Sequence, residues 1–252
     1  MRVVISTGAG ISKASGLPVY RGEGGLWTEN PELEAKSSNA GVKNYLDELW
    51  AEWGPFREKM KTVHPNAAHL AIARLQLEHP DDVTVVTQNV DGLHQQALER
   101  LDDTAPPESY FAAHNKIYEL HGNVWLDKCS NLECEESRTN WDSTYPGPGE
   151  CQRCGAPTRP DMVLFSEMLP EYKWLKAQGA CLMADLYVAV GTSGTVYPAS
   201  ELVTVAKKNG ARTLLVNSEP WEYPHPDFDE TIIGNAEDIL SDILEREIGT
   251  SG

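Results

Sequence analysis

The sequence predicts an α/β protein with a doubly wound parallel sheet and a second, smaller lobe. Short β-branched and apolar runs each end in a small or polar loop, which is typical of strands covered on both faces. Helical stretches, such as Asn66 to Glu78 and Ala199 to Asn209, lie between these runs and favour a parallel sheet with helices on both sides. Four cysteines within residues 129–154 indicate a separate metal-binding module.

Four runs carry the strand prediction. They are Val3–Ile5, Val83–Val86, Leu186–Val190 and Thr213–Val216. Each is followed by a polar or glycine-containing loop. In a doubly wound sheet, ligands bind outside the carboxyl ends of the strands. We therefore expect these four loops to share one crevice.

Two stretches interrupt the alternation and are expected to form the smaller lobe. In the first, residues 28–65, an amphipathic helix is predicted from the helical spacing of Val42, Tyr45, Leu46, Leu49, Trp50 and Trp53. Gly54-Pro55 is expected to end this helix and to start a short one carrying Phe56. The second stretch is residues 122–162. Residues 1–27, 66–121 and 163–248 are assigned to the sheet lobe.

The four clustered cysteines fit a structural zinc site. Cys129 and Cys134 are separated by four residues, and Cys151 and Cys154 by two. Two close pairs joined by a loop suit a tetrahedral four-thiolate zinc ion, and four protein ligands leave no position for catalysis. The alternative is four unrelated thiols. Cys181 is interpreted as a buried packing residue.

Charge and length exclude several classes of function. The chain has 252 residues, 38 acidic against 21 basic, and a formal net charge of −17. This balance disfavours non-specific binding to nucleic acid or to an anionic membrane, but it is compatible with lysine-bearing peptides. The sequence shows no membrane-span-length apolar run and no signal-peptide pattern. We expect a monomer in the reducing cytoplasm.

Small and polar residues at the strand ends are candidates for binding a nucleotide. Glycines in a turn let backbone amides approach a phosphate closely, although Lys13 occupies the third glycine position of a dinucleotide motif. Thr192 and Ser193 offer hydroxyls to phosphate, and Asn217 and Glu219 could bind ribose. The alternative is a set of ordinary strand-end loops. The candidates are Gly8, Ala9, Gly10, Ile11, Gly191, Thr192, Ser193, Asn217 and Glu219.

A second polar set lies after the Val83–Val86 run and in the segment Leu120-His121-Gly122. Asn89 and Asp91, next to Gln88, together offer the donor and acceptor that a carboxamide requires. His121 precedes Gly122, which leaves room for a ligand, and a histidine has a pKa suited to proton transfer. We choose His121 as the candidate general base. Histidines are, however, more often structural than catalytic.

Taken in order, these segments resemble the sirtuin family, and the resemblance covers almost the whole chain. The matching segments are Gly8–Ser12, Ser15–Pro18, Tyr20–Gly22, Thr87–His94, His121-Gly122, the four cysteines, Arg159–Glu167, Gly191–Ser193 and Asn217. Sirtuins are NAD-dependent protein-lysine deacylases. The resemblance implies a Rossmann-like large lobe and a small lobe of a zinc module and a helical module. NAD and an acyl-lysine peptide are expected to meet in the cleft between them.

The resemblance also implies roles for individual residues. Gly8, Ala9, Gly191, Ser193 and Asn217 are expected to serve the phosphates and adenosine of NAD, with Ala236 near the adenine. Ile11, Asn89 and Asp91 are expected to hold the nicotinamide carboxamide, and Tyr20 and Arg21 to belong to a cofactor-binding loop. The extended segment that pairs with the peptide is expected to contain Val163, Phe165, Ser166 and Glu167.

The mechanism implied by the resemblance transfers the acyl group to ADP-ribose. The acyl oxygen attacks the anomeric carbon and nicotinamide leaves. His121 then accepts a proton from the ribose hydroxyls. The products are free lysine, nicotinamide and O-acyl-ADP-ribose.

Several residues depart from the family pattern, among them Val19, where Asp or Thr is common, and Tyr20, where Phe is common. Trp53 and Phe56 occupy the positions of the Tyr and Arg that bind acidic acyl groups in desuccinylating sirtuins, which favours an acetyl or longer apolar group. Alternatively, they only pack the helical module. Arg57 is one residue away and could substitute only if the helix shifts. Ser166 replaces a glycine, which should cost stability if that position needs a positive φ.

Two alternative functions remain open at this point. One is a mono-ADP-ribosyltransferase or NAD glycohydrolase on the same scaffold, which a peptide site blocked by Ser166 would favour. The other is a non-enzymatic NAD-binding or zinc-ribbon interaction module. The presence of His121, Asn89 and Asp91 argues against the second.

Overall fold

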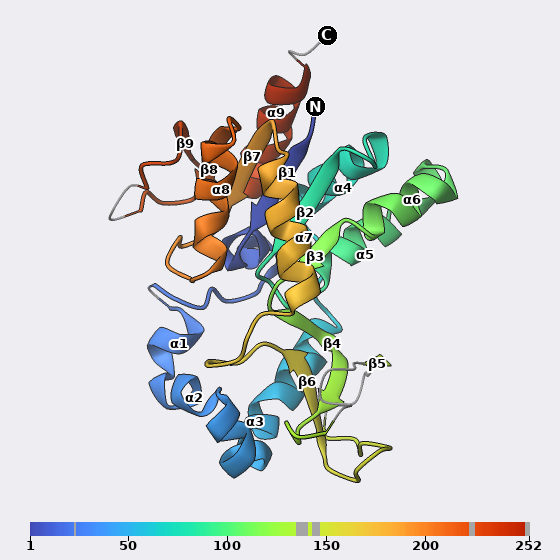
Figure 1. Cartoon of the computed structure of the whole chain (residues 1–252), viewed down its shortest axis with the longest axis vertical. Helices are drawn as coiled ribbons and strands as arrows, with labels where there is room; N and C mark the ends of the chain where they lie inside the picture. Colours follow the sequence, from blue (N-terminus) through green and yellow to red (C-terminus); the bar gives the residue numbers. More distant parts are fainter. Residues whose placement is uncertain (23, 135–140, 143–146, 222–224, 250–252) are drawn as a thin grey trace.

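The larger of two sheets forms the upper half of the molecule in Figure 1. The computed structural model describes residues 1–22, 24–134, 141–142, 147–221 and 225–249. All neighbouring strands of this sheet are parallel. Their spatial order is β3 (Ile117–Glu119), β2 (Val83–Thr87), β1 (Val3–Thr7), β7 (Leu186–Val190), β8 (Arg212–Asn217) and β9 (Glu230–Ile233). This is the strand order of a Rossmann-like sheet, with the reversal at β1 and β7.

Helices cover both faces of the sheet because its strands are apolar on both sides. Every residue of β1, β2 and β7 is buried. Val3 and Ile5 pack on one face and Val4 on the other. The first face is covered by α4 (Ala67–Glu78), α5 (Leu93–Glu99), α6 (Pro107–His114) and α9 (Ala236–Gly249), and the second by α7 (Glu171–Leu182) and α8 (Leu202–Lys208). The predicted doubly wound sheet is confirmed.

The carboxyl ends of the central strands lie at the same edge. In the register, Thr7 of β1 is opposite Thr87 of β2 and Val190 of β7. The loops after these strands therefore emerge together, toward the lower half of the molecule in Figure 1. This convergence was expected from the sequence.

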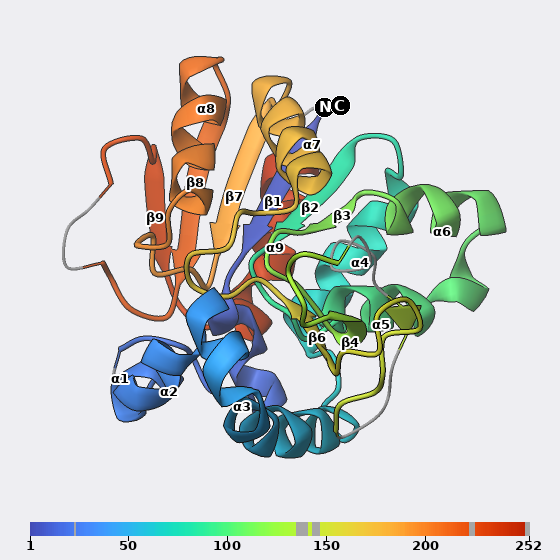
Figure 2. The same cartoon turned by 60° about the horizontal axis from the view of Figure 1, so that its bottom comes forward.

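The lower half contains the second sheet and three helices. An antiparallel sheet has the order β5 (Trp141–Asp142), β4 (Gly122–Cys129), β6 (Thr158–Met162). The helices are α1 (Leu26–Glu29), α2 (Pro31–Lys36) and α3 (Asn39–Met60). Figure 2 shows α3 along one side of this half. The indole N–H of Trp50 donates to the carbonyl of Thr158 at 2.9 Å and ties α3 to β6.

The prediction that Gly54-Pro55 ends the long helix is wrong. Helix α3 continues through Pro55 to Met60. The buried stripe of Leu49, Trp53, Arg57 and Met60 crosses the proline without interruption, so packing stabilises both halves. Pro55 and Ala51 are exposed, so the carbonyl left without a donor lies on the side that water can reach.

The backbone irregularity lies at a different place in the same helix. Tyr45 has φ −135° and ψ 28°, outside the helical region. Its side chain is 44% exposed, so its predicted place on the buried face is also wrong. The helical spacing failed there because the local distortion rotates Tyr45 away from the core.

The other predicted helices are found with small shifts. Helix α4 begins after Asn66, which caps it together with His69 in a reciprocal capping box. The stretch predicted from Ala199 begins as a 3₁₀ turn, Ala199–Glu201, before α8. In the part of the chain that the structure describes, no helix combines the length and apolar character required to cross a membrane.

Candidate functional site

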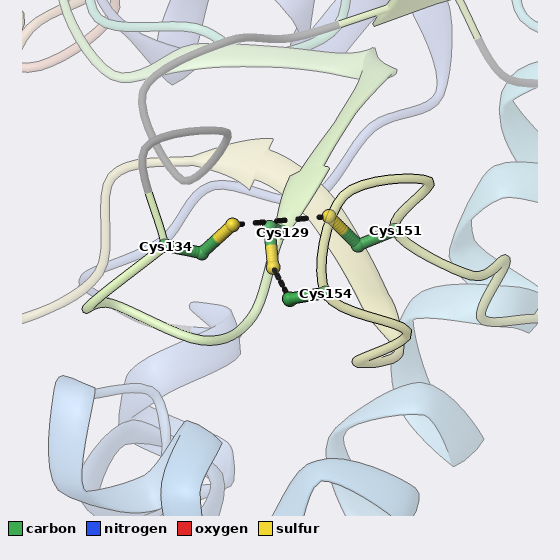
Figure 3. A group of neighbouring side chains, drawn as sticks. All are labelled: Cys129, Cys134, Cys151 and Cys154. Atoms are coloured by element: carbon green, nitrogen blue, oxygen red, sulfur yellow. Dashed lines mark hydrogen bonds between the residues drawn. The ribbon is translucent and has the colours of Figure 1, made fainter.

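The four clustered cysteines converge on one point, as Figure 3 shows. Cys129 ends β4, and the other three lie in the loops between β4 and β6. Their sulfur atoms lie within 4.8 Å of one another, with Cys129–Cys154 at 3.6 Å and Cys134–Cys151 at 4.0 Å. A zinc ion with Zn–S bonds of about 2.3 Å requires sulfurs about 3.8 Å apart. The cluster therefore fits one tetrahedral structural zinc ion, and none of the four thiols is in a disulfide. Cys181 is fully buried in the core, as expected.

The loops after β1 and β7 meet backbone against backbone. The amide of Gly10 donates to the carbonyl of Gly191 at 2.8 Å, and that of Gly8 to Val190 at 3.0 Å. A Cβ atom on Gly10 would lie 2.7 Å from the Cα of Gly191. Glycine is therefore required at position 10 for the close approach of the two loops, independently of any contact with a phosphate.

A pocket of about 150 Å³ opens between these loops and the start of α9. Four of the predicted nucleotide-binding residues line it: Gly10, Gly191, Asn217 and Ala236. Lys13 and Glu237 also line it, and neither was among the candidates. Ser193 and Glu219 are exposed and are not part of the lining as the described residues define it. Ala9 is half-buried at the start of a 3₁₀ helix, Ala9–Ser15, and Thr192 is buried, with its carbonyl accepting from Trp221 at 2.8 Å.

Asn89, Asp91 and Ser12 form a buried hydrogen-bonded group deeper in the crevice. The side-chain NH₂ of Asn89 donates to the carbonyl of Gly8 at 3.1 Å and to the Ser12 hydroxyl at 3.2 Å. The Ser12 hydroxyl donates to Asp91 at 2.7 Å. The Oδ1 atom of Asn89 is buried without a hydrogen-bond partner among the described residues. An unsatisfied buried acceptor fits the NH₂ of a carboxamide ligand. Ile11, fully buried, lies in the same loop as Ser12.

Burial controls the ionisation of this group. It raises the pKa of Asp91, and the hydrogen bonds from Leu93 and Ser12 act against that shift. Burial, with a smaller contribution from the Asp91 charge, raises the pKa of Tyr20 well above its usual value. The phenol therefore stays protonated at neutral pH.

Two buried histidines, His69 and His94, lie next to this group, with ring centroids 5.0 Å apart. The Nδ1 atom of His69 accepts from the backbone N–H of Asn66 at 3.4 Å. The proton of the His69 ring is therefore on Nε2, which faces the Ser12 oxygen at 3.5 Å. His94 Nε2 lies 2.9 Å from the Thr7 hydroxyl. Burial lowers the pKa of both, to about 4 for His94, so both are neutral near pH 7. Ser12, His69 and His94 were not among the predicted site residues, although Ser12 and His94 lie within the sequence motifs.

His121 is arranged as a base. Its Nδ1 atom lies 2.9 Å from the carbonyl of Gln88, which can only accept, so Nδ1 carries the proton and Nε2 presents a lone pair. Burial lowers the pKa of His121, while the bond to Gln88 opposes the shift. The imidazole is therefore neutral at pH 7. Gly122 has φ +82°, and a Cβ atom there would lie 1.9 Å from the carbonyl of Asp161, so only glycine fits next to His121.

The segment from Val163 to Glu167 crosses between the two halves of the molecule. The Val163 amide donates to the carbonyl of His121 at 2.8 Å, and the Phe165 amide donates to Ser37 at 2.8 Å. Glu167 accepts from the Leu164 amide at 2.9 Å and pairs with the buried Arg159. Glu167 therefore holds the turn of its own segment.

Ser166 has φ +70°, in the left-handed region that favours glycine. It is the one residue other than glycine with positive φ in the described part of the chain. The condition under which serine was expected to cost stability is therefore met. The segment nevertheless keeps its two bonds to His121 and Ser37.

Arg57 is fixed in the interior by several interactions. Its guanidinium pairs with Asp127 at 2.5 Å and donates to the carbonyl of Val124 at 2.7 Å. Both side chains are almost completely buried. Trp53 is buried beside Leu164, and Phe56 is half-buried against another apolar cluster. Arg57 cannot reach an acyl carboxylate without breaking this ion pair.

The cofactor loop is attached to the helices that follow it. Arg21 pairs with Glu34 of α2 at 2.5 Å. The Tyr20 ring stacks on Trp27 of α1 with centroids 5.6 Å apart. Trp27 was not among the candidates, because its position in the chain gives no sign of which rings it meets.

Known proteins share the sequence pattern of this chain. The family model of the Sir2 family matches residues 8–198. An NAD-dependent protein deacylase of Aquifex aeolicus is 37% identical over 221 residues, which is 87% of this chain and 84% of that protein. The NAD-dependent protein deacylase 2 of Archaeoglobus fulgidus is 38% identical over 250 residues, or 96% of this chain and 90% of that protein.

Solved structures agree with the sequence comparisons. A structure described as "Structural Basis for the Mechanism and Regulation of Sir2 Enzymes" has a TM-score of 0.75 and 35% identity, covering 99% of this chain and 93% of its own. A mutant of a Sir2 homologue in complex with ADP-ribose has a TM-score of 0.81 and 27% identity, covering 100% of this chain and 94% of its own. The chain belongs to the Sir2 family, the sirtuins.

Proposed function

We propose that this protein is an NAD-dependent protein-lysine deacylase and that acetyl-lysine is its main substrate. The observation that carries the proposal is the position of His121. The ring of His121 is bonded through Nδ1 to the carbonyl of Gln88, which precedes Asn89 in the crevice, and Nε2 is left to accept a proton. The backbone carbonyl of His121 accepts from Val163 and so joins the residue to the Val163–Glu167 segment. Relatives with this family fold are named NAD-dependent protein deacylases and deacetylases.

The crevice residues would hold NAD in two places. The pocket lined by Gly10, Gly191, Asn217 and Ala236 would take the adenosine side. Asn89 Oδ1 and the Asp91 carboxylate would bind the nicotinamide carboxamide, with Ile11 beside it. NAD would supply a leaving group, nicotinamide, and an ADP-ribosyl acceptor for the acyl group.

The role of His121 is to accept a proton at Nε2. The Gln88 carbonyl fixes the tautomer and the ring orientation, and the lowered pKa keeps the base form present at neutral pH. A positioned general base contributes about 10²–10⁴-fold to a rate. The ribose hydroxyl is the proton donor that this arrangement suits.

The Val163–Glu167 segment would bind the peptide as an added strand. The Arg159–Glu167 pair holds the turn at the end of this segment from within, and Phe165, 40% exposed, lies at the surface. Two solved relatives were determined with peptides, one a deacetylated p53 peptide and the other a propionylated peptide. The surplus of acidic residues suits a lysine-bearing partner.

An acetyl or apolar acyl group suits the helical module better than succinyl. Trp53 and Phe56 offer no charge to a carboxylate, and Arg57 is held by Asp127. All five cysteines are free thiols, which suits a reducing cytoplasm. Transfer of ADP-ribose to protein, or simple hydrolysis of NAD, is not favoured, because Ser166 leaves the bonds of the peptide segment in place.

The acyl preference is tested by incubating the protein and NAD with one peptide sequence carrying acetyl-, propionyl-, butyryl- or succinyl-lysine. Mass spectrometry follows the free-lysine product. We expect the acetyl, propionyl and butyryl peptides to be deacylated, and the succinyl peptide to be deacylated at least about tenfold more slowly. Succinyl turnover equal to acetyl would contradict the assignment of Trp53, Phe56 and Arg57.

A further inference from the structure

Three aromatic rings connect the cofactor loop with the peptide segment. Tyr20 stacks on Trp27 with centroids 5.6 Å apart and planes at 23°. Trp27 in turn meets Phe165 edge-on, at 5.7 Å and 67°. Tyr20 belongs to the expected cofactor-binding loop, and Phe165 to the segment proposed to bind the peptide. The indole of Trp27 is thus in contact with both.

The backbone holds Trp27 to the cofactor loop. Its amide donates to the carbonyl of Tyr20 at 2.9 Å, and the Leu26 amide donates to Val19 at 2.8 Å. A displacement of Tyr20 therefore displaces Trp27 as well.

The backbone also ties Phe165, the third ring, to helix α2. Phe165 donates its amide to Ser37 at 2.8 Å, and Ser37 is bonded to Leu33 of α2 at 2.9 Å. Helix α2 also carries Glu34, the partner of Arg21. The peptide segment and the cofactor loop thus share one support, and Trp27 fills the space between their rings.

We propose that Trp27 is a positioning residue that couples peptide binding on the Phe165 segment to the arrangement of the cofactor loop. A bound peptide would restrict Phe165, which would hold Trp27 and thereby keep Tyr20 in its stacked position. This inference rests on the proposed function. Each aromatic pair of this geometry is worth roughly 2- to 10-fold in an equilibrium constant. By linkage, the peptide and the ADP-ribosyl ligand must then strengthen each other's binding by the same factor.

The test measures that factor with ligands that do not react together. ADP-ribose is titrated calorimetrically into the full chain, with and without a saturating acetyl-lysine peptide. The variants are Trp27→Ala, Trp27→Leu and Trp27→Phe, with Tyr45→Ala as the control for loss of another aromatic ring in the lower half of the molecule. Thermal unfolding establishes that each variant is folded.

In the wild type, the peptide is expected to lower the Kd of ADP-ribose about fivefold or more. Trp27→Ala and Trp27→Leu should reduce this ratio to below about twofold, whereas Trp27→Phe keeps part of it and Tyr45→Ala all of it. A merely structural role would weaken each ligand separately and leave the ratio unchanged. Trp27→Leu keeps apolar volume without a ring, so it decides the question if Trp27→Ala does not fold.

Two results would overturn the inference alone. Either the ratio survives in Trp27→Leu, or the wild type binds both ligands without any effect of one on the other. If the wild type binds neither ADP-ribose nor the peptide, the proposed function fails and this inference fails with it.

Discussion

At the scale of single residues, the orientation of His121 is the feature with the most direct consequence for activity. Because Gln88 fixes the proton on Nδ1, Nε2 is free to act as the base. His121→Ala should lower the deacylation rate by about 10²–10⁴-fold. The lowered pKa of His121 keeps the base form at neutral pH, so the acid limb of the wild-type rate profile should lie below about pH 6.5.

The check is a pH–rate profile of the wild type beside His121→Ala. Gln88 bonds to the His121 ring through its backbone carbonyl, so Gln88→Ala should keep the position of the acid limb. Activity of His121→Ala within a factor of about ten of the wild type would contradict the assignment.

Ser166 carries backbone strain that a single substitution can relieve. A left-handed conformation costs a residue other than glycine about 1–2 kcal/mol. Ser166→Gly should therefore raise the free energy of unfolding by about 1 kcal/mol, since glycine's greater freedom in the unfolded chain offsets part of the gain. Urea unfolding measures it, with Ser166→Ala as the control that keeps the Cβ atom. Equal stability of the glycine and alanine variants would show that φ +70° costs nothing here.

His94 makes stability depend on pH in a definite direction. Burial lowers its pKa from 6.5 to about 4 in the folded protein. Between these values the unfolded chain binds a proton that the folded protein does not, so stability falls as the pH decreases from about 6.5 to about 4. Between about pH 7 and about pH 5, His94 should therefore lower the free energy of unfolding by about 2 kcal/mol.

The measurement compares urea unfolding of the wild type and His94→Gln at the two pH values. Glutamine can still donate to Thr7 but does not titrate. The wild type should lose about 2 kcal/mol more than the variant. Equal losses would mean that His94 is not a neutral buried histidine.

At the scale of elements, the contact between α3 and β4 depends on one buried ion pair. Arg57 bonds to Asp127 and to the carbonyl of Val124. Arg57→Ala leaves the Asp127 charge buried without this partner, and removal of one member of such a pair costs about 3–5 kcal/mol. Chemical unfolding should show this loss, whereas Arg74→Ala on the exposed face of α4 should change stability by less than about 0.5 kcal/mol. A small effect of Arg57→Ala would reopen a role for this arginine in binding an acyl carboxylate.

The elements that the sequence predicts well are those with local signals. Continuous apolar runs such as Leu186–Val190 predicted the central strands, and the paired spacing of the cysteines predicted their cluster. The polar residues Asn89 and Asp91 could be placed at a strand end because they follow the Val83–Val86 run, and parallel strands finish at one edge. These features depend on neighbouring residues in the chain.

The features that the sequence did not reveal depend on distant contacts. Ser12 and His69 are 57 positions apart, and Arg57 and Asp127 are 70 apart. Helix α3 continues through Pro55 because its buried stripe packs on both sides of the proline. The prediction gave more weight to the local helix-breaking signal of Gly54-Pro55. Glu167, expected to contact the peptide, also forms an ion pair with Arg159 that the sequence did not indicate.

At the scale of the whole molecule, the candidate site is assembled from parts that are far apart in the chain. The Gly8–Ser12 loop, Asn89, Asp91 and His121 come from the edge of the large sheet, and the Val163–Glu167 segment joins that edge to the helices of the lower half. The cysteine cluster lies in the lower half, among the loops beside β4 and β6. This arrangement suits the proposed binding of NAD on one side of His121 and of a peptide on the other.

The stoichiometry of the reaction tests the central proposal most directly. The protein is incubated with NAD and an acetyl-lysine peptide, and nicotinamide, free-lysine peptide and acetyl-ADP-ribose are quantified together by mass spectrometry. A deacylase that transfers the acyl group to ADP-ribose should form the three products in equal amounts, and none without the peptide. Release of nicotinamide without deacetylated peptide, or ADP-ribose attached to protein, would contradict the proposed function.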